Sequence, residues 1–169
     1  MIKRIGFTVV AVLALSMAAQ AADMHMHIGT WVLNVAKSTS SETSQRPAND
    51  GNVVPRSGGQ VISMNGGWLI VKNHGVDKDG KATSQNRILK FDGVARPEIG
   101  PQPGALGFLT TGTTIDDFHS KSVRVSIEGK LQRSEVTVVS PDGKSKTHTI
   151  SRVDRDGKTY NSVFVFDKQ

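Results

Sequence analysis

The chain of 169 residues contains no cysteine, and aromatic residues make up only 5% of it. The absence of cysteine excludes disulfide bonds, thiolate metal ligands and a cysteine nucleophile. It also excludes the lipid-bearing cysteine that bacterial lipoproteins carry at their cleavage site. The scarcity of aromatic residues argues against a deep aromatic cage around a ligand.

Long apolar runs are also scarce, and the single one lies at the beginning of the chain. Lys3 and Arg4 precede the mainly apolar stretch 5–17, and the small-x-small sequence Ala19-Gln20-Ala21 follows it. This order predicts a secretory signal peptide over residues 1–21, and the run is too short for a stable membrane span. We therefore expect a periplasmic or secreted protein with no integral membrane segment after cleavage.

Runs of five or six like charges are absent. Removing Lys3 and Arg4 lowers the net charge from +6 to +4 and leaves 148 residues, enough for one domain. This modest excess allows at most weak contact with an anionic surface and does not indicate nucleic-acid binding. We expect a monomer.

Catalytic motifs are missing as well. The chain has no Gly-x-Ser-x-Gly elbow, no His-Glu-x-x-His motif and no phosphate-binding loop. Asp116, His119 and Ser120 supply the residue types of an acyl-transfer triad, but neighbours on one strand point to opposite faces and do not converge. We expect a protein that is not an enzyme and has no cofactor.

Short alternating segments separated by turn sequences fill the chain from residue 28 onward. The turns include Asn65-Gly66-Gly67 and three Asp-Gly-Lys sequences, at 77–81, 141–144 and 154–158. The aspartates lack the distal glutamate and flanking helices of a calcium loop, so hairpin turns explain them better. The pattern predicts a single up-and-down antiparallel β-barrel of about eight or nine strands over residues 28–169, with long loops at 38–57 and 92–107 covering its mouth.

Gly29 and Trp31 stand at the start of the first expected strand, an arrangement that resembles the Gly-x-Trp signature of the lipocalins or calycins. The strings 29–38 and 163–169 also resemble the two ends of small exported bacterial lipocalin-like proteins. The resemblance implies that Trp31 plugs the closed end of the barrel and that a basic residue packs over it. Arg152 is the expected residue, with Arg155 and Lys168 as alternatives.

The resemblance also implies a barrel able to hold one small ligand. Alternation places Val123, Val125 and Ile127 inward and Arg124 outward. Thr83, Gln85, Thr147 and Thr149 lie on faces that can also point inward and make the cavity partly polar. The expected pocket residues are Trp68, Ile70, Arg87, Phe91, Val123, Val125, Ile127, Phe164 and Phe166.

Two further groups of side chains have less specific spacing. His74, His119 and His148 are available for a three-nitrogen metal site on neighbouring strands, but we expect them to face solvent. Arginines 87, 124, 133 and 152 are available as a clamp for a carboxylate or phosphate, and here too the outward position is the simpler expectation.

Met24, His25, Met26 and His27 follow the predicted cleavage site. Imidazole and thioether groups suit copper, so this tetrad is a candidate metal site. The simpler interpretation is that residues 22–27 form a flexible N-terminal tail.

Three functions follow from this sequence. The first is an exported lipocalin-like protein that binds a small apolar or amphipathic molecule in its barrel. The second is a cell-envelope interaction or structural module whose barrel is filled by side chains, and the third is a periplasmic copper binder that uses the Met/His tetrad. An open cavity would favour the first and a packed interior the second.

Overall fold

The computed structural model describes residues 24–42, 53–97, 107–154 and 156–169, and the predicted signal peptide lies outside them. Within these ranges no helix has the length and apolarity needed to cross a membrane. The helical elements of the described residues are two short 3₁₀ helices, η1 (Met24–His27) and η2 (Val35–Lys37). The strands are β1 (Gly29–Leu33), β2 (Thr39–Ser40), β3 (Ser57–Asn65), β4 (Trp68–Val76), β5 (Ala82–Leu89), β6 (Arg96–Pro97), β7 (Phe108–Thr114), β8 (His119–Ser126), β9 (Leu131–Val139), β10 (Ser145–Val153) and β11 (Thr159–Lys168).

The strands form one antiparallel sheet with the order β5-β4-β3-β1-β11-β10-β9-β8-β7-β6, and β2 adds to β11. Nearly every strand therefore pairs with its neighbour in sequence, and β1 pairs with β11 to join the two ends of the chain. The predicted all-β, up-and-down fold is confirmed. Within the described ranges, the nine strands longer than two residues agree with the predicted eight or nine.

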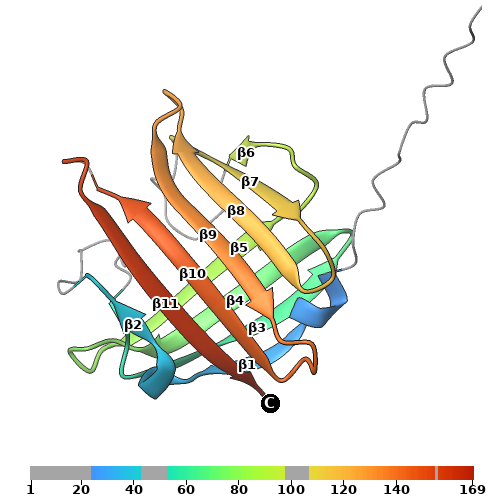
Figure 1. The fold of residues 1–169 in the computed structure, drawn as a ribbon, viewed down its shortest axis with the longest axis vertical. Coiled ribbons are helices and arrows are strands. Elements are labelled where there is room, and N and C mark those ends of the chain that lie inside the picture. The colour runs from blue at the N-terminus through green and yellow to red at the C-terminus, as the bar shows by residue number, and fades with distance from the viewer. Residues whose placement is uncertain (1–23, 43–52, 98–106, 155) are drawn as a thin grey trace, which may run out of the picture.

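The sheet curls, so that β3, β4 and β5 lie behind β7 to β11 and cross them (Figure 1). The chain after β5 returns to β7 and brings the two sides together. Asp92 bridges Thr113, the amide of Gly93 donates to the carbonyl of Gly112 at 2.8 Å, and β6 pairs with the same strand. The sheet thus becomes a curled half-barrel with an interior.

Turn chemistry explains this connectivity. Gly66 and Gly67 both have positive φ, 55° and 78°, as a two-residue hairpin between β3 and β4 requires. Asp77 Oδ1 accepts from the amides of Asp79 and Lys81 at 2.9 and 2.8 Å, and Asp154 Oδ1 holds the turn at 156–158 in the same way. The aspartates therefore build hairpin turns.

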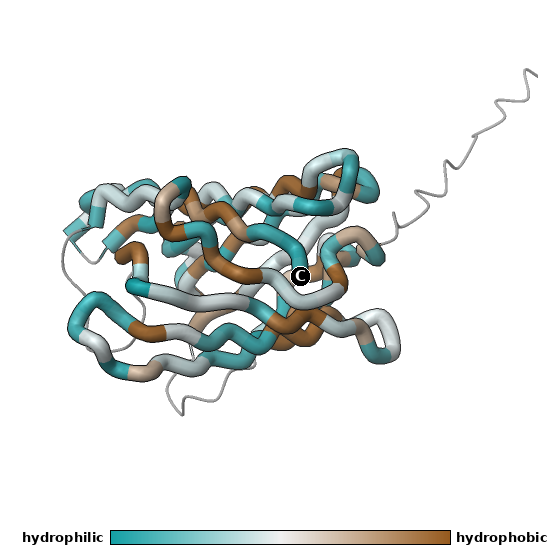
Figure 2. Tube along the Cα trace, turned by 90° about the horizontal axis from the view of Figure 1, so that it is seen from below, coloured by the Kyte–Doolittle hydropathy of each residue, from teal (hydrophilic) through white to brown (hydrophobic). Residues whose placement is uncertain are grey.

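Hydrophobic and hydrophilic residues alternate along the strands in short steps (Figure 2). The apolar core collects at one end of the half-barrel around Trp31, whose side chain is fully buried. Met26, Phe91, Phe118 and Phe164 pack against this cluster from its margin. Its buried members are Met24, Trp31, Leu33, Ile62, Leu69, Val71, Val139 and Phe166.

Two lysines pack over the indole of Trp31. Lys146 Nζ lies 4.4 Å from the ring centroid, and Lys168 Nζ lies 5.1 Å from it. Gly29, at φ 132°, leaves room for this arrangement, because a Cβ there would lie 3.0 Å from Cε of Lys168. The side chain of Lys168 thus passes over Gly29 and reaches the ring of Trp31.

The expectation that Arg152 covers Trp31 is therefore wrong, and Lys168, one of the alternatives, takes that place together with Lys146. Arg152 pairs in register with Tyr160, and its guanidinium lies 5.2 Å from that ring and bonds to Glu42. Lys146 pairs with Phe166 at the other end of the same two strands. Five residues of β10 lie between the two cations. Arg155 lies outside the described residues.

The expectation of a flexible tail is also wrong for residues 24–27. They form η1, in which Met24 and His27 are buried, and the indole N–H of Trp31 donates to the carbonyl of His27 at 2.9 Å. The helix closes the base of the half-barrel next to the tryptophan. The core gains an apolar side chain from Met24, which a free tail would leave in solvent.

Replacing Trp31 with alanine is expected to lower the free energy of unfolding by about 3–5 kcal/mol, because a fully buried ring is lost. Chemical denaturation of the mature protein measures this loss. Trp68→Ala is the matched control, because Trp68 is only half-buried, beside Lys90 and Arg96. Equal losses for the two variants would contradict the assignment of Trp31 as the base of the core.

Candidate ligand cavity

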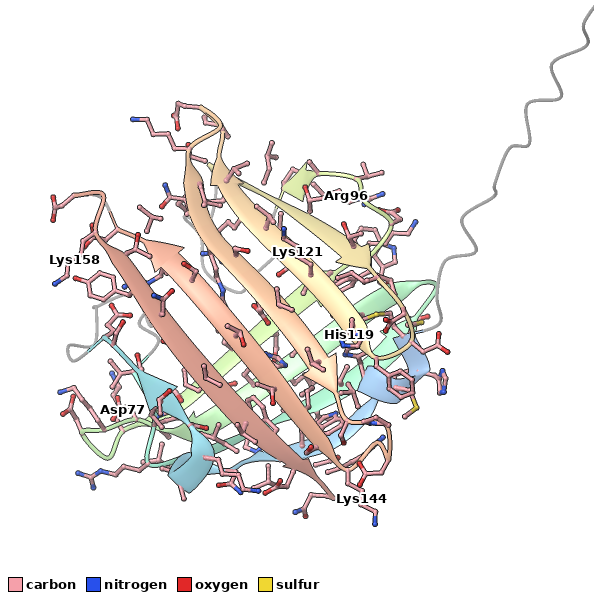
Figure 3. All side chains as sticks on the ribbon, in the orientation of Figure 1. Asp77, Arg96, His119, Lys121, Lys144 and Lys158 are labelled. Carbon is pink, nitrogen blue, oxygen red and sulfur yellow. The ribbon has the colours of Figure 1, made fainter. Side chains whose placement is uncertain are left out.

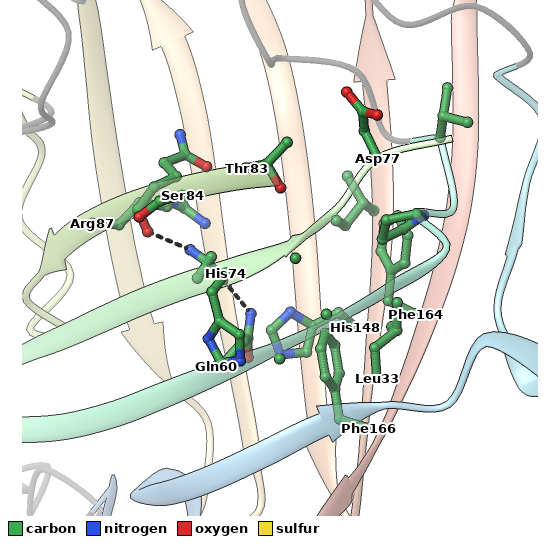
Figure 4. Close-up of a pocket in the computed structure, with 18 of the residues that line it drawn as sticks. Leu33, Gln60, His74, Asp77, Thr83, Ser84, Arg87, His148, Phe164 and Phe166 are labelled. Carbon is green, nitrogen blue, oxygen red and sulfur yellow. Dashed lines mark hydrogen bonds between the residues drawn. The ribbon is translucent and has the colours of Figure 1, made fainter. Parts of the chain in front are cut away.

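A cavity of about 210 Å³ lies inside the curled sheet, away from Trp31. Figure 3 labels Asp77 and Lys158 at one end of the molecule and His119 and Lys144 at the other. The cavity extends towards the end at which Asp77 lies. Its lining residues come from the two facing walls of the half-barrel and from the segment before β3 (Figure 4). The lining residues used below are Leu33, Gln60, Asn73, His74, Asp77, Thr83, Gln85, Arg87, Arg133, Glu135, His148, Ile150, Phe164 and Phe166.

The inner face of β8 carries polar side chains, which reverses one prediction. Ser120, Ser122 and Ser126 are buried, so Val123 and Val125 lie on the opposite, outer face. Across the strand pair, Ser122 stands opposite the buried Glu135. Arg124 therefore faces inward with the serines, the reverse of what we expected, and Ile127, in the turn after β8, is 68% exposed.

Glu135, on β9, is the centre of a buried charge network. Its Oε2 accepts from Arg133 Nη2 at 2.7 Å and from Arg87 Nη1 at 3.3 Å, while its Oε1 lies 3.0 Å from His148 Nδ1. These groups come from three strands, β5, β9 and β10. The carboxylate thus joins both sides of the half-barrel, because Arg87 reaches it from the opposite wall.

The protonation states of this network follow from its surroundings. Burial alone would raise the pKa of Glu135, but the charges of Arg133 and Arg87 and the hydrogen bond from His148 outweigh it and hold that pKa well below its usual range. Burial lowers the pKa of His148, and the Glu135 carboxylate opposes this only in part. At neutral pH the network therefore contains an ionised Glu135 and a neutral His148.

A chain of amides connects this wall to the base. Lys146 Nζ donates to Gln60 Oε1 at 2.7 Å, Gln60 Nε2 donates to Asn73 Oδ1 at 2.8 Å, and Asn73 Nδ2 donates to the carbonyl of Gln85 at 3.2 Å. Burial lowers the pKa of Lys146 to about 7. The amide side chains are oriented by these bonds, so each presents a fixed surface to the cavity.

The remaining wall is apolar. Leu33, Ile150, Phe164 and Phe166 line it, and the imidazole of His148 lies 5.2 Å from the ring of Phe166. The cavity therefore has an apolar wall and a polar wall that meet at His148. A molecule with an apolar body and a polar group matches this division.

Part of the expected pocket lines this cavity. Arg87, Phe164 and Phe166 do so, together with Thr83 and Gln85, and their contact with a ligand stays a prediction. Arg152 is buried, contrary to the expectation that the arginines point outward, and Arg87 is buried in agreement with its place in the expected pocket.

Other expected pocket residues lie elsewhere. Trp68 and Ile70 are on the face of β4 opposite the buried Leu69 and Val71, and Phe91 packs against the core cluster. Thr147 and Thr149 face outward, because Lys146, His148 and Ile150 take the inner positions of β10.

Gln60, Asn73 and Glu135 were not predicted. The signal for Glu135 is the alternation Arg133-x-Glu135 on β9 with Lys146-x-His148 on the next strand, which places four titratable side chains on one face. The hydrophobic pattern alone assigns that face to solvent.

The three histidines that were available for a metal site do not come together, and His148 is buried, contrary to the expectation that they face solvent. His148 bonds to Glu135, His119 Nδ1 lies 2.7 Å from Asp116 Oδ1, and His74 is exposed on β4. Over residues 24–42, 53–97, 107–154 and 156–169, no group of three or more His, Cys, Asp or Glu side chains has the spacing of a metal site.

In the Met/His tetrad, burial lowers the pKa of His27 to about 4. Met24 is part of the core, so the four side chains do not present a common ligand set.

Comparison with known proteins finds no matching family model and no matching curated protein. Solved structures of similar shape include lobster apocrustacyanin A1, at 12% identity and a TM-score of 0.41, with 86% of this chain and 62% of that chain covered. Apocrustacyanins C1 and C2 also match at 12% identity, with TM-scores of 0.42 and 0.41, and each match covers 85% of this chain and 61% of the other. The chain thus spans about three fifths of the length of these structures.

Glu135→Gln is expected to lower the free energy of unfolding by about 3–5 kcal/mol, because the substitution removes the counter-charge of two arginines in a buried site. Urea denaturation at pH 7 measures it. Asp92→Asn is the control: Asp92 also pairs with two cations, Arg96 and Lys90, but at the surface, so its loss should hardly move the midpoint. A Glu135→Gln protein as stable as Asp92→Asn would show that the network contributes little.

Stability is expected to fall as the pH is lowered from 6.5 to 4. In this window an unfolded histidine binds a proton, but His27, with its pKa lowered to about 4, does not, and the pKa of His148 is lowered too. Acid therefore favours the unfolded chain, and below the usual pKa of glutamate Glu135 adds to the same trend.

Denaturation midpoints at pH 7, 5.5 and 4.5 test this trend. His27→Gln should flatten part of the slope, whereas the exposed His74→Gln should not change it. Equal stability at the three pH values would contradict the assignment of neutral, buried histidines.

Proposed function

We propose that the protein is an exported lipocalin-like binding protein that holds one small amphipathic molecule in its cavity. The observation that carries the proposal is the two-sided lining, with four apolar side chains on one wall and the amides and charge network on the other. Polar groups that are already oriented provide specificity, and apolar walls provide most of the affinity.

The volume limits the size of the ligand. A cavity of about 150 Å³ accepts benzene, and this one measures about 210 Å³. It therefore suits a molecule of roughly ten heavy atoms, such as one substituted ring or a short alkyl chain with a polar head. Long fatty acids and isoprenoids exceed it unless they project from the mouth.

Export is part of this proposal and rests on residues 1–21. The positive start, the apolar run and the small-x-small site support cleavage after Ala21, which would leave Ala22 as the first residue. Much of the loops at 38–57 and 92–107, which we expected to cover the mouth, lies outside the described residues.

Native mass spectrometry of the protein purified from its own host is expected to show a mature chain beginning at Ala22 that carries one small molecule. Thr83→Trp should abolish this extra mass, because Thr83 is a half-buried residue of the lining and an indole there fills the cavity. The control is Thr149→Trp, on the outer face of β10, which should keep the molecule.

A bare protein that also binds none of a panel of short alcohols, short fatty acids and single-ring compounds would contradict the binding function. The interaction module would then be the better explanation. A molecule retained equally by the two tryptophan variants would place its site outside this cavity.

A further inference from the structure

Nε2 of His148, in the cavity wall, is one of the buried side-chain nitrogens that have no hydrogen-bond partner in the described part of the chain. The atom has no solvent exposure, and its residue is 9% exposed and lines the cavity (Figure 4). Arg87 and Arg133, which line the same cavity, are held by Glu135 through their Nη atoms. A buried polar atom left without a partner costs free energy, so its presence in a binding cavity indicates what a ligand supplies.

The proton of His148 is on the other nitrogen. Nδ1 lies 3.0 Å from Oε1 of Glu135, an ionised carboxylate that only accepts hydrogen bonds, so Nδ1 carries the hydrogen. Because His148 is neutral in this surrounding, Nε2 is a bare lone pair. The unpartnered Nε2 atom is therefore an acceptor, and it requires a donor.

The polar groups beside His148 are already engaged. Gln60 accepts from Lys146 and donates to Asn73, and Asn73 donates in turn to Gln85. The charged side chains of the lining are two arginines, Arg87 and Arg133, and two carboxylates, Glu135 and Asp77. An even charge balance favours a neutral occupant over an ion.

We propose that the ligand is a neutral molecule whose O–H or N–H group donates a hydrogen bond to His148 Nε2 while its apolar part lies against Phe164 and Phe166. The inference rests on the proposed binding function and names the chemistry of the bound molecule. It assigns His148 as the residue that selects for a donor, with Glu135 fixing its tautomer.

Benzyl alcohol and anisole test this selection, because they are isomers of one formula and only the alcohol has a donor. Benzoate of similar size serves as the anionic probe. NMR titration of the full mature protein is expected to show benzyl alcohol binding about tenfold more tightly than anisole, the effect of one hydrogen bond to a buried acceptor. Benzoate should bind more weakly than the alcohol.

Two variants isolate the contact. The hydration free energy of each free isomer does not depend on the protein variant. A change in the ratio of the two affinities between variants therefore reports a change in the protein–ligand contacts. His148→Phe should remove the preference for the alcohol, and His74→Phe, which replaces an exposed histidine of the same lining, should keep it.

Nitrogen NMR of ¹⁵N-histidine-labelled wild-type protein keeps the proposal falsifiable if His148→Phe does not fold. The Nε2 resonance of His148 should have the shift of an unprotonated nitrogen and should move on addition of benzyl alcohol but not of anisole. An Nε2 that is protonated in the free protein at pH 7 would overturn the inference.

The outcomes separate the two proposals. If none of the three probes binds, the proposed function itself fails. If the alcohol and anisole bind equally, or benzoate binds most tightly, the cavity binds small molecules but the requirement for a neutral donor is wrong.

Discussion

The buried carboxylate of Glu135 is the constraint on which the interior depends. An ionised group without water needs counter-charges and hydrogen bonds, and Arg133, Arg87 and His148 supply them from three strands. A shift of one residue in the register of β9 would turn Glu135 and Arg133 outward together and leave Arg87 and His148 in the interior without the carboxylate. The network therefore fixes the register of the strands as strictly as a hydrophobic core does, and it explains why valines occupy the outer face of β8.

The interior of the half-barrel has two regions with different roles. Around Trp31 the packing is apolar and closed, with η1 beneath the ring and two lysines over it. Towards the mouth the side chains are polar and held apart by their hydrogen bonds, which leaves a cavity. Lys146 belongs to both, because its ammonium contacts the indole and starts the amide chain through Gln60. The closed end thus supports the orientation of the groups at the open end.

The sequence predicts the parts of this structure that depend on local chemistry. Hairpin turns such as Gly66-Gly67 and Asp77–Lys81 are encoded within a few residues, so the number and order of the strands follow from them. Alternation on β8 gives the period but not the face, and the assumption that valines point inward failed because the interior is polar. Arg87 and Glu135 are 48 residues apart, and Lys146 and Gln60 are 86 apart. No local pattern reveals such pairs, so most of the candidate site emerged only from the fold.

The lone pair on His148 connects stability with the proposed function. An aromatic or aliphatic side chain at this position would pack against Phe166 without leaving a bare acceptor. In the protein without a ligand, the imidazole therefore lowers the stability of the folded state. Glu135 prevents a change of tautomer, because its ionised carboxylate keeps the hydrogen of His148 on Nδ1 and leaves Nε2 without one. Within the described cavity lining the neighbouring amides are engaged with one another, so we infer that an entering molecule supplies the compensation. The hydrogen bond between His148 and Glu135 thus orients the imidazole and also leads to the inference that the bound molecule is a hydrogen-bond donor.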